Sequence, residues 1–365
     1  MIQEFLSIYN ADKQFTNLQI GNYIFNDFQA IQPKSIVIFS CPSLENENEF
    51  SDVHSIRRHF YNLATGNWKV PIFDIGNIIP AQNISDTFFA IKQVTEFILS
   101  KKAIPLFIGG STNLLYPFYE ALESYFPLIN FTSIEPEIHL PYEIEENISN
   151  ENFLTKLINK QTTSLLHYTN LGYQSYFTSY KIIDVLQNLN FDTYKLGDIV
   201  ADMKEAEPVL RTSDLVLYNF SSISSYSKCF TKNNLNGFSP REACTLSRYC
   251  GISQQLKAIY FSDFHKGNAQ DNLLIAQIIW YFLEGLNVKT NLPEDTNHQL
   301  TYNVLMQDKE LIFIQDILSQ KWWIKVFLND QKSEHIIIPS TENDYKQALQ
   351  GQIPERFWKS LRKIL

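Results

Sequence analysis

The stretch Ser35-Ile36-Val37-Ile38-Phe39-Ser40 is a short, continuous apolar run, typical of strands in a parallel sheet that is buried on both faces. Comparable runs recur along the chain, at residues 104–108, 128–131, 164–168, 215–218 and 258–261. Segments with apolar residues at helical spacing separate them, and one, Ser85 to Leu99, begins with a Ser-Asp pair that suits a helix N-cap. This alternation predicts an α/β domain whose mostly parallel sheet is covered by helices on both faces.

A further helix is expected from Ser239, its cap, through Pro240 at the first helical position to about Cys250, with Gly251 ending it. In folds of this class, ligand sites lie beyond the carboxyl ends of the strands. The polar residues that follow the apolar runs are therefore the candidates for function.

The pattern changes after about residue 290. Residues 291–297 indicate a linker, and residues 311–314 and 322–326 are typical of strands in a small antiparallel unit. We expect two parts, an α/β domain over 1–290 and an α+β extension over 291–365. Trp322, Trp323 and Phe357 give the extension more apolar surface than about 70 residues can bury alone, so it should pack on the main domain.

Composition narrows the classes of partner. The 365 residues include 39 Asp and Glu against 30 Lys and Arg, a formal net charge of −9, which argues against binding to nucleic acid or anionic membranes. No apolar stretch reaches the ~18 residues that span a bilayer, and no secretory signal is visible, so we expect a cytoplasmic protein. The four cysteines, which we expect to be reduced thiols without a metal, are Cys41, Cys229, Cys244 and Cys250.

Two strand ends carry nearly the same polar string, Ile-Asn-Phe-Thr-Ser-Ile at 129–134 and Tyr-Asn-Phe-Ser-Ser-Ile at 218–223. Because strand side chains alternate, Asn130 and Thr132 should share one side of their strand, as should Asn219 and Ser221. A third end, Ile108-Gly109-Gly110-Ser111, passes through two glycines. These either make a tight turn into a helix or let the backbone approach a ligand closely.

The segment Asn236 to Ser253, which begins Asn-Gly-Phe-Ser-Pro-Arg-Glu-Ala-Cys, resembles the ureohydrolase superfamily of arginase, agmatinase and formimidoylglutamase. The Gly109-Gly110 turn, the stretch Ile56 to Tyr61 and the run Arg211 to Ser221 add to the resemblance, which is greatest for the formimidoylglutamase-like branch. It implies a three-layer α/β/α arginase-like fold and a family chemistry in which a water between two manganese ions hydrolyses guanidino or formimino groups. It also implies a homo-oligomer, since these enzymes often form trimers or hexamers.

This sequence departs from the family's manganese motifs at every ligand position. Thr112 stands where the family's Gly-Gly-Asp-His motif has its histidine. The Asp-Ala-His-x-Asp motif corresponds to Asn130, Thr132 and Ile134, and the later Asp-x-Asp motif to Asn219 and Ser221. Neutral side chains cannot offset the dehydration of two dications, so we expect no manganese cofactor, no metal ligands and no catalytic residues.

One acid remains from the resemblance, because Asp263 stands where the family has the glutamate that receives the cationic end of the substrate. The nearby His265 could be a base, although an Asp-x-His at a strand end is more often a solvated loop pair. We therefore expect a vestigial pocket, called here the strand-end pocket, lined by Ser111, Thr112, Asn130, Thr132, Ile134, Asn219, Ser221 and Asp263.

Two functional hypotheses follow. In the first, the chain has lost manganese catalysis and acts as a binding or scaffold protein. In the second, it is a C–N hydrolase of linear amidines with altered chemistry, using a hydroxyl such as that of Ser111 or Thr112 or a metal bound elsewhere. An unassisted hydroxyl is a weak nucleophile, and the sequence offers no Ser-His-acid set, which favours the first hypothesis. No protein partner can be named from the sequence.

Overall fold

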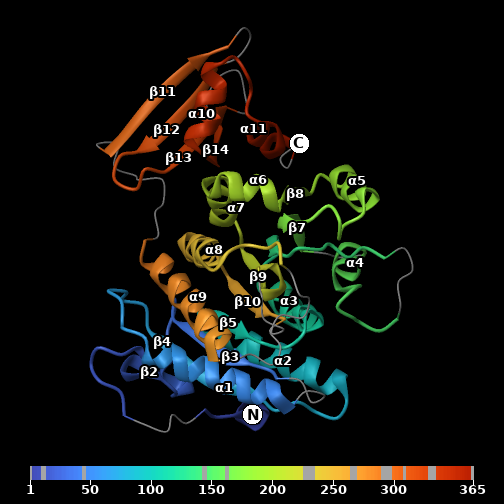
Figure 1. Cartoon of the computed structure of the whole chain (residues 1–365), viewed down its shortest axis with the longest axis vertical. Coiled ribbons are helices and arrows are strands. Elements are labelled where there is room, and N and C mark those ends of the chain that lie inside the picture. Colours follow the sequence, from blue (N-terminus) through green and yellow to red (C-terminus); the bar gives the residue numbers. More distant parts are fainter. Residues whose placement is uncertain are drawn as a thin grey trace.

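The computed structural model describes residues 2–9, 14–42, 47–141, 146–160, 164–224, 235–263, 269–288, 298–306, 310–327 and 334–362. A large α/β domain occupies one end of the long axis of the molecule, and a small sheet with two helices lies at the other end (Figure 1). We call the described residues from 2 to 288 the main domain and those from 298 to 362 the C-terminal unit.

The main domain is built on a ten-stranded sheet in the order β1-β4-β3-β5-β10-β9-β6-β7-β8, with β2 beside β4. All of its pairings are parallel except that of β1 with β4. The strands are β1 (Leu6–Ser7), β2 (Ile24–Phe25), β3 (Ile36–Ser40), β4 (Ile72–Ile78), β5 (Ile104–Ile108), β6 (Ile129–Ile134), β7 (Leu165–Tyr173), β8 (Asp192–Lys195), β9 (Leu215–Asn219) and β10 (Ala258–Ser262). The predicted mostly parallel α/β fold is confirmed.

Helices cover both faces of this sheet because alternate strand side chains feed two separate apolar cores. One layer comprises α1 (Glu47–Asn62), α6 (Leu196–Ala201), α7 (Ala206–Arg211), α8 (Pro240–Ile252) and α9 (Ala269–Asn287). The other comprises α2 (Ile84–Ser100), α3 (Leu115–Glu123), α4 (Phe153–Ile158) and α5 (Tyr180–Asn188). The three predicted layers are therefore present. The start of α2 differs by two residues from the prediction, because Asn83 rather than Ser85 caps it.

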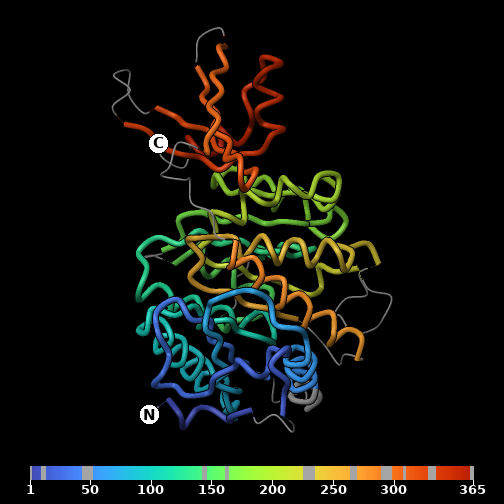
Figure 2. Tube along the Cα trace, turned by 90° about the vertical axis from the view of Figure 1, so that its left-hand side faces the viewer, coloured from blue at the N-terminus to red at the C-terminus, as the bar shows by residue number. Residues whose placement is uncertain are grey.

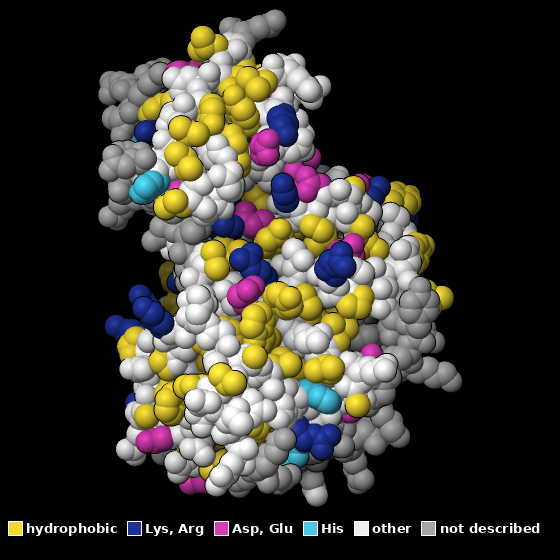
Figure 3. All heavy atoms as spheres, turned by 60° about the vertical axis from the view of Figure 1, so that its left-hand side comes forward, with side chains coloured by type: hydrophobic (Ala, Val, Ile, Leu, Met, Phe, Trp, Pro, Cys, Tyr) yellow, Lys and Arg dark blue, Asp and Glu magenta, His cyan; other side chains and the backbone are white. Residues whose placement is uncertain are grey.

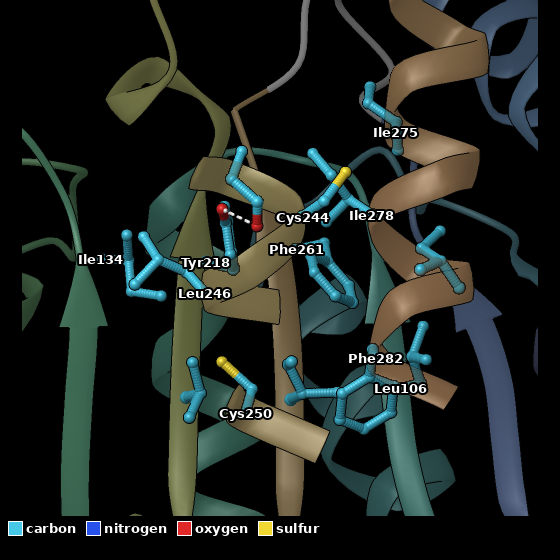
Figure 4. Packing of buried hydrophobic residues seen from close by; sticks show 14 of the residues in the cluster. Leu106, Ile134, Tyr218, Cys244, Leu246, Cys250, Phe261, Ile275, Ile278 and Phe282 are labelled. Carbon is cyan, nitrogen blue, oxygen red and sulfur yellow. Dashed lines mark hydrogen bonds between the residues drawn. The ribbon is translucent and has the colours of Figure 1, made fainter. Parts of the chain in front are cut away.

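The packing of α8 on α9 corrects one prediction. Ser239 and Glu242 form a capping box at the start of α8, as its sequence suggests. The hydroxyl of Tyr218 on β9 donates to the backbone carbonyl of Ala243 in the first turn of this helix (2.9 Å; Figure 4). Gly251, however, does not end the helix. A Cβ on it would lie 2.1 Å from the Phe282 carbonyl oxygen of α9, so glycine serves close helix–helix contact here.

The C-terminal unit is an antiparallel sheet in the order β11-β12-β13-β14 with two helices. Its elements are β11 (Gln299–Leu305), β12 (Glu310–Asp316), β13 (Trp322–Phe327), β14 (His335–Ser340), α10 (Glu342–Leu349) and α11 (Glu355–Arg362). They enclose an apolar core of their own that includes Phe313, Trp322 and Phe357. The small antiparallel sheet is confirmed, while the predicted linker at 291–297 lies outside the described residues.

The C-terminal unit contacts the main domain around α7. The buried guanidinium of Arg211 lies 4.6 Å from the centre of the Trp323 ring and donates to the Trp322 carbonyl (3.0 Å). Lys321 pairs with Glu207 on the same short helix. The unit forms a separate lobe at the end of the molecule opposite the N-terminus (Figure 2), and side chains of both charge signs gather where the lobes meet (Figure 3). Within the described part of the chain, no helix is long and apolar enough to cross a membrane.

Candidate functional site

A cavity of about 200 Å³ opens at the carboxyl ends of four neighbouring strands, β5, β10, β9 and β6. Its walls come from the residues at or just after those strand ends and from the segment that follows β6. The lining residues are Thr112, Glu135, Pro136, Glu137, His139, Asn150, Glu151, Asn219, Ser221 and Asp263. This cavity is the strand-end pocket, at the edge of the sheet where a parallel α/β fold places its ligands.

The amide of Asn219 is the centre of the pocket. Its Nδ2 donates to Oδ2 of Asp263 (2.6 Å) and to Oε1 of Glu135 (3.2 Å). Its Oδ1 accepts from the backbone N–H of Ser221 (2.8 Å), which fixes the orientation of the amide. The hydroxyl of Thr112 also donates to Oδ2 of Asp263. Four strand ends are thus tied together by hydrogen bonds between neutral donors and two acids.

Asp263 adopts a backbone conformation that few residues other than glycine favour. Its φ is +57°, in the left-handed region, where a side chain on Cβ crowds the backbone. Its backbone N–H donates to the Gly110 carbonyl (3.1 Å), so the turn after β5 holds the turn after β10 in place. The carboxylate therefore faces Thr112 and Asn219 from a strained position.

Glu135 is a buried acid whose protonation differs from that of a surface glutamate. Burial raises its pKa to about 8, the hydrogen bond from Asn219 acts in the opposite direction, and the charge of Asp263 raises the pKa further. At neutral pH the folded protein therefore holds Glu135 mostly in its uncharged form.

The lining of the strand-end pocket is acidic. It includes four carboxyl groups, from Glu135, Glu137, Glu151 and Asp263, together with His139, whose Nδ1 lies 3.7 Å from Oε1 of Glu137. None of the described residues that line it is a lysine or an arginine. The pocket is consequently suited to a cationic molecule rather than an anionic one.

No protein-family model matches the chain, and no curated protein matches it. Its structure is similar to that of formimidoylglutamase from Bacillus subtilis, with a TM-score of 0.65 and 14% identity over 78% of this chain and 97% of that chain. Formiminoglutamase of Trypanosoma cruzi, in a crystal structure with Mn²⁺, gives a TM-score of 0.62 and 13% identity over 74% and 99%. Agmatine ureohydrolase of Thermoplasma volcanium gives 0.58 and 14% over 74% and 94%. The chain has the arginase fold.

The donors of the strand-end pocket do not fit the manganese pair of that fold's enzymes. Asn219 directs two N–H donors and Thr112 an O–H donor at the carboxylates that a cation would need, and a donor hydrogen repels a metal ion. Among the described residues, no group of three or more His, Cys, Asp or Glu side chains could hold a metal. Hard dications need several anionic or neutral oxygen and imidazole ligands at once, and the described lining does not supply such a set.

The structure brings together four of the eight predicted pocket residues and separates the rest. Thr112, Asn219, Ser221 and Asp263 line the strand-end pocket. Ser111 lies beside it as the residue before a short 3-10 helix (Thr112–Leu114), with its hydroxyl on Asn113 (2.5 Å). His265 lies outside the described residues.

The assignment of Asn130, Thr132 and Ile134 to this pocket is wrong. Asn130 is at the start of β6, where its amide donates to Asp214 (3.1 Å), and Thr132 shares a 2.7 Å hydrogen bond with Ser213. Both line a different cavity, and Ile134 is buried in the apolar core between the sheet and α8 (Figure 4). The physical reason is length, because β6 continues to Ile134 and only later residues reach its carboxyl end.

The residues of this segment that do reach the pocket are Glu135, Glu137 and His139. Sequence reasoning missed them because it placed the motif on the polar string inside the strand. A usable signal was present in Glu135-Pro136-Glu137-Ile138-His139, where two acids and a histidine alternate directly after an apolar run.

Proposed function

We propose that this chain is a non-hydrolytic binding protein on the arginase fold, which takes a small organic cation such as an amine or a guanidine into the strand-end pocket. The observation that carries the proposal is the Asn219 amide, which hydrogen bonds both Asp263 and Glu135. These bonds hold the two acids in place with neutral donors. They leave Asp263, together with Glu137 and Glu151 on the walls, as the anionic features of the pocket.

A cationic ligand fits the electrostatics of this pocket. The described lining offers no lysine or arginine to balance its carboxylates. An ammonium or guanidinium group of a ligand can supply that positive charge, with charge-assisted hydrogen bonds to carboxylate oxygens. Metal-assisted hydrolysis is not expected, because the N–H and O–H donors that Asn219 and Thr112 direct at the two acids oppose binding of the ions that would activate a water. Scaffolding without a ligand is the broader form of the same hypothesis.

One observation favours a second candidate, hydrolysis of a linear amidine by a protein hydroxyl. The hydroxyl of Thr112 donates a hydrogen bond to Asp263, the arrangement of a nucleophile with a neighbouring base. Against it, Oδ2 of Asp263 also accepts from Asn219, and this second hydrogen bond stabilises the charged carboxylate and weakens it as a base.

Calorimetric titration of the full chain tests the proposal, with agmatine, putrescine, arginine and 4-guanidinobutyrate as probes. We expect at least one probe to bind and Asp263→Asn to weaken it about tenfold or more, the usual effect of removing a charged hydrogen-bond partner. Asp184→Asn is the matched control, because Asp184 is exposed on α5. Absence of binding by every probe would contradict the proposal.

Turnover is measured in the same samples, with and without added Mn²⁺, and formiminoglutamate is included as a substrate. We expect no product above buffer and no stoichiometric metal in the purified protein. Product formation that disappears in Thr112→Ala would support the second candidate instead. Product formation that requires Mn²⁺ would show that the pocket holds metal in spite of its donors.

A further inference from the structure

A second cavity, of about 420 Å³, lies where the C-terminal unit meets the main domain. We call it the junction cavity. Its main-domain wall comes from β6, β7 and β8 and includes Thr132, Thr169 and Asp192, while Ile337 on β14 and Ser360 on α11 line the other side. Asn130 lines this cavity at the amino end of β6. The junction cavity therefore lies toward the amino ends of the strands, whereas the strand-end pocket lies at their carboxyl ends.

Each charged side chain on the described wall already has a partner of opposite charge. Asp192 is 2.9 Å from Nε2 of His167 and 3.4 Å from Nζ of Lys359. The wall's other cation, Arg356, pairs with Asp344 (3.1 Å) and Glu205 (2.7 Å). A ligand that brought its own charge would have to be desolvated without gaining an unpaired counter-charge, so the electrostatics of the wall favour an uncharged ligand.

Three hydroxyl groups of the described wall make no hydrogen bond to a described residue, those of Thr169 and Tyr194 in the main domain and that of Ser360 in the C-terminal unit. Thr169 on β7 is only 4% exposed. Its hydroxyl is not among the fully buried unpartnered atoms, and it lines the cavity. It therefore marks a point where a molecule in the cavity can form a hydrogen bond with the protein.

The opposite side of the cavity is apolar because of β14. Four consecutive residues of β14, Ile336 to Pro339, line the cavity, and Ile336 and Ile338 also pack on the core of the C-terminal unit. Val209 on α7 extends the same apolar surface. The junction cavity thus has one hydroxyl-bearing face and one apolar face, the usual composition of a small-molecule site between domains.

We propose that the junction cavity binds a small uncharged molecule that carries hydroxyl or amide groups on one side and an apolar face on the other, the chemistry of a nucleoside or a neutral sugar. This ligand is distinct from the cation proposed for the strand-end pocket. Because its contacts come from both lobes, its binding energy also holds the C-terminal unit on the main domain.

Calorimetric and thermal-shift titrations of the full chain test the class of ligand. Adenosine, uridine and glucose are the neutral probes, and AMP, UMP and glucose 6-phosphate are their charged counterparts. We expect at least one neutral probe to bind, and its phosphorylated counterpart to bind at least about tenfold more weakly. Equal or tighter binding of the phosphorylated form, or binding by none of the neutral probes at millimolar concentration, would overturn the proposal.

Two variants test the place of binding. Thr169→Val removes the hydroxyl that lines the cavity while nearly keeping the shape of the side chain, and Ser360→Ala removes the hydroxyl from the other lobe. Each should lose about five- to tenfold in affinity. Thr301→Val on the exposed face of β11 is the control. Full affinity in both folded variants would overturn the proposal. Asp263→Asn should leave this binding unchanged, so a failure here is distinct from a failure at the strand-end pocket.

Discussion

Arg57 shows how a single residue determines local stability in this protein. It is 1% exposed, and it donates to Asp74 (2.7 Å from Nε and 3.2 Å from Nη2) and to the Gly76 carbonyl (2.9 Å). Tyr61 adds a hydrogen bond to the same carboxylate (2.8 Å). The stretch Ile56 to Tyr61, which contributes to the family resemblance, is therefore a structural motif that anchors α1 to β4 and does not line the strand-end pocket.

We expect Arg57→Met to lower the free energy of unfolding by about 3–5 kcal/mol, because the buried Asp74 carboxylate loses its counter-charge. Urea unfolding measures the change. Arg58→Met is the control, since Arg58 is exposed on the same helix and its removal should change stability by no more than about 0.5 kcal/mol. Equal effects of the two substitutions would contradict the assignment.

Glu135 makes stability depend on pH. Its pKa is about 8 in the folded state against an ordinary value of 4.5, so the native state keeps a proton that the unfolded chain releases. The contribution of Glu135 to the free energy of unfolding is therefore fully present below about pH 4.5. It decreases by about 1.4 kcal/mol per pH unit as the pH rises from 4.5 to about 8.

Glu135→Gln removes this titration while keeping an amide oxygen for Asn219. We expect the variant to equal the wild type near pH 5 and to exceed it in stability by pH 8, as measured by urea unfolding at both values. Glu334→Gln, at an exposed position, should show the same pH profile as the wild type. A wild-type profile for Glu135→Gln would mean that Glu135 is ionised when folded.

At the scale of elements, the contact of α8 with α9 depends on two glycines. A Cβ on Gly285 would lie 2.1 Å from the Arg248 carbonyl oxygen and 3.0 Å from Cα of Gly251. We expect Gly285→Ala to destabilise the protein by about 1–3 kcal/mol, because overpacking exceeds the gain in helix propensity.

Gly197→Ala provides the matched comparison for thermal unfolding. Gly197 is also helical, on α6, but a Cβ there has no atom within 4 Å. We expect it to be neutral or slightly stabilising, by up to about 1 kcal/mol. A neutral result for Gly285→Ala would show that the two helices can move apart at little cost.

The elements also show what the sequence could predict. Continuous apolar runs predicted the positions of β3, β5, β9 and β10 to within one residue. The reason is that a strand buried on both faces needs apolar side chains at nearly every position. Four strands of the main sheet, β1, β2, β4 and β8, were not predicted; β4 carries the buried polar residues Asp74 and Asn77, which interrupt its apolar pattern. The pocket was half predictable, since Thr112 and Asn219 follow from motif position, whereas the true end of β6 depends on tertiary pairing with β7 and β9.

For the whole molecule, Glu207 is one of several residues that join the two lobes, beside the pairs of Arg356 with Glu205 and of Lys359 with Asp192. It pairs with Arg211 (3.3 Å) and with Lys321 of the C-terminal unit, and burial lowers the pKa of Arg211 to about 10. Removing the one carboxylate leaves two buried cations, Arg211 and Lys321, without a counter-charge, a change that usually costs about 3 kcal/mol or more.

We therefore expect Glu207→Gln to loosen the C-terminal unit, and limited proteolysis between residues 288 and 298 should be at least about tenfold faster than in the wild type. Glu284→Gln is the control, because Glu284 pairs with Arg248 at a part-exposed site (2.9 Å) within the main domain. Cleavage at the wild-type rate in Glu207→Gln would show that other contacts hold the two lobes together.

At Asp263, the residue that suits the left-handed backbone best differs from the residue that the pocket needs. Glycine adopts a φ of +57° at less cost than aspartate, although aspartate is one of the few other residues that visit this region. A change to glycine would relax the turn after β10 and at the same time delete the acid that faces Thr112 and Asn219. The pocket is thus open to loss by a substitution that improves the backbone locally, and selection for thermostability alone would tend to erase it.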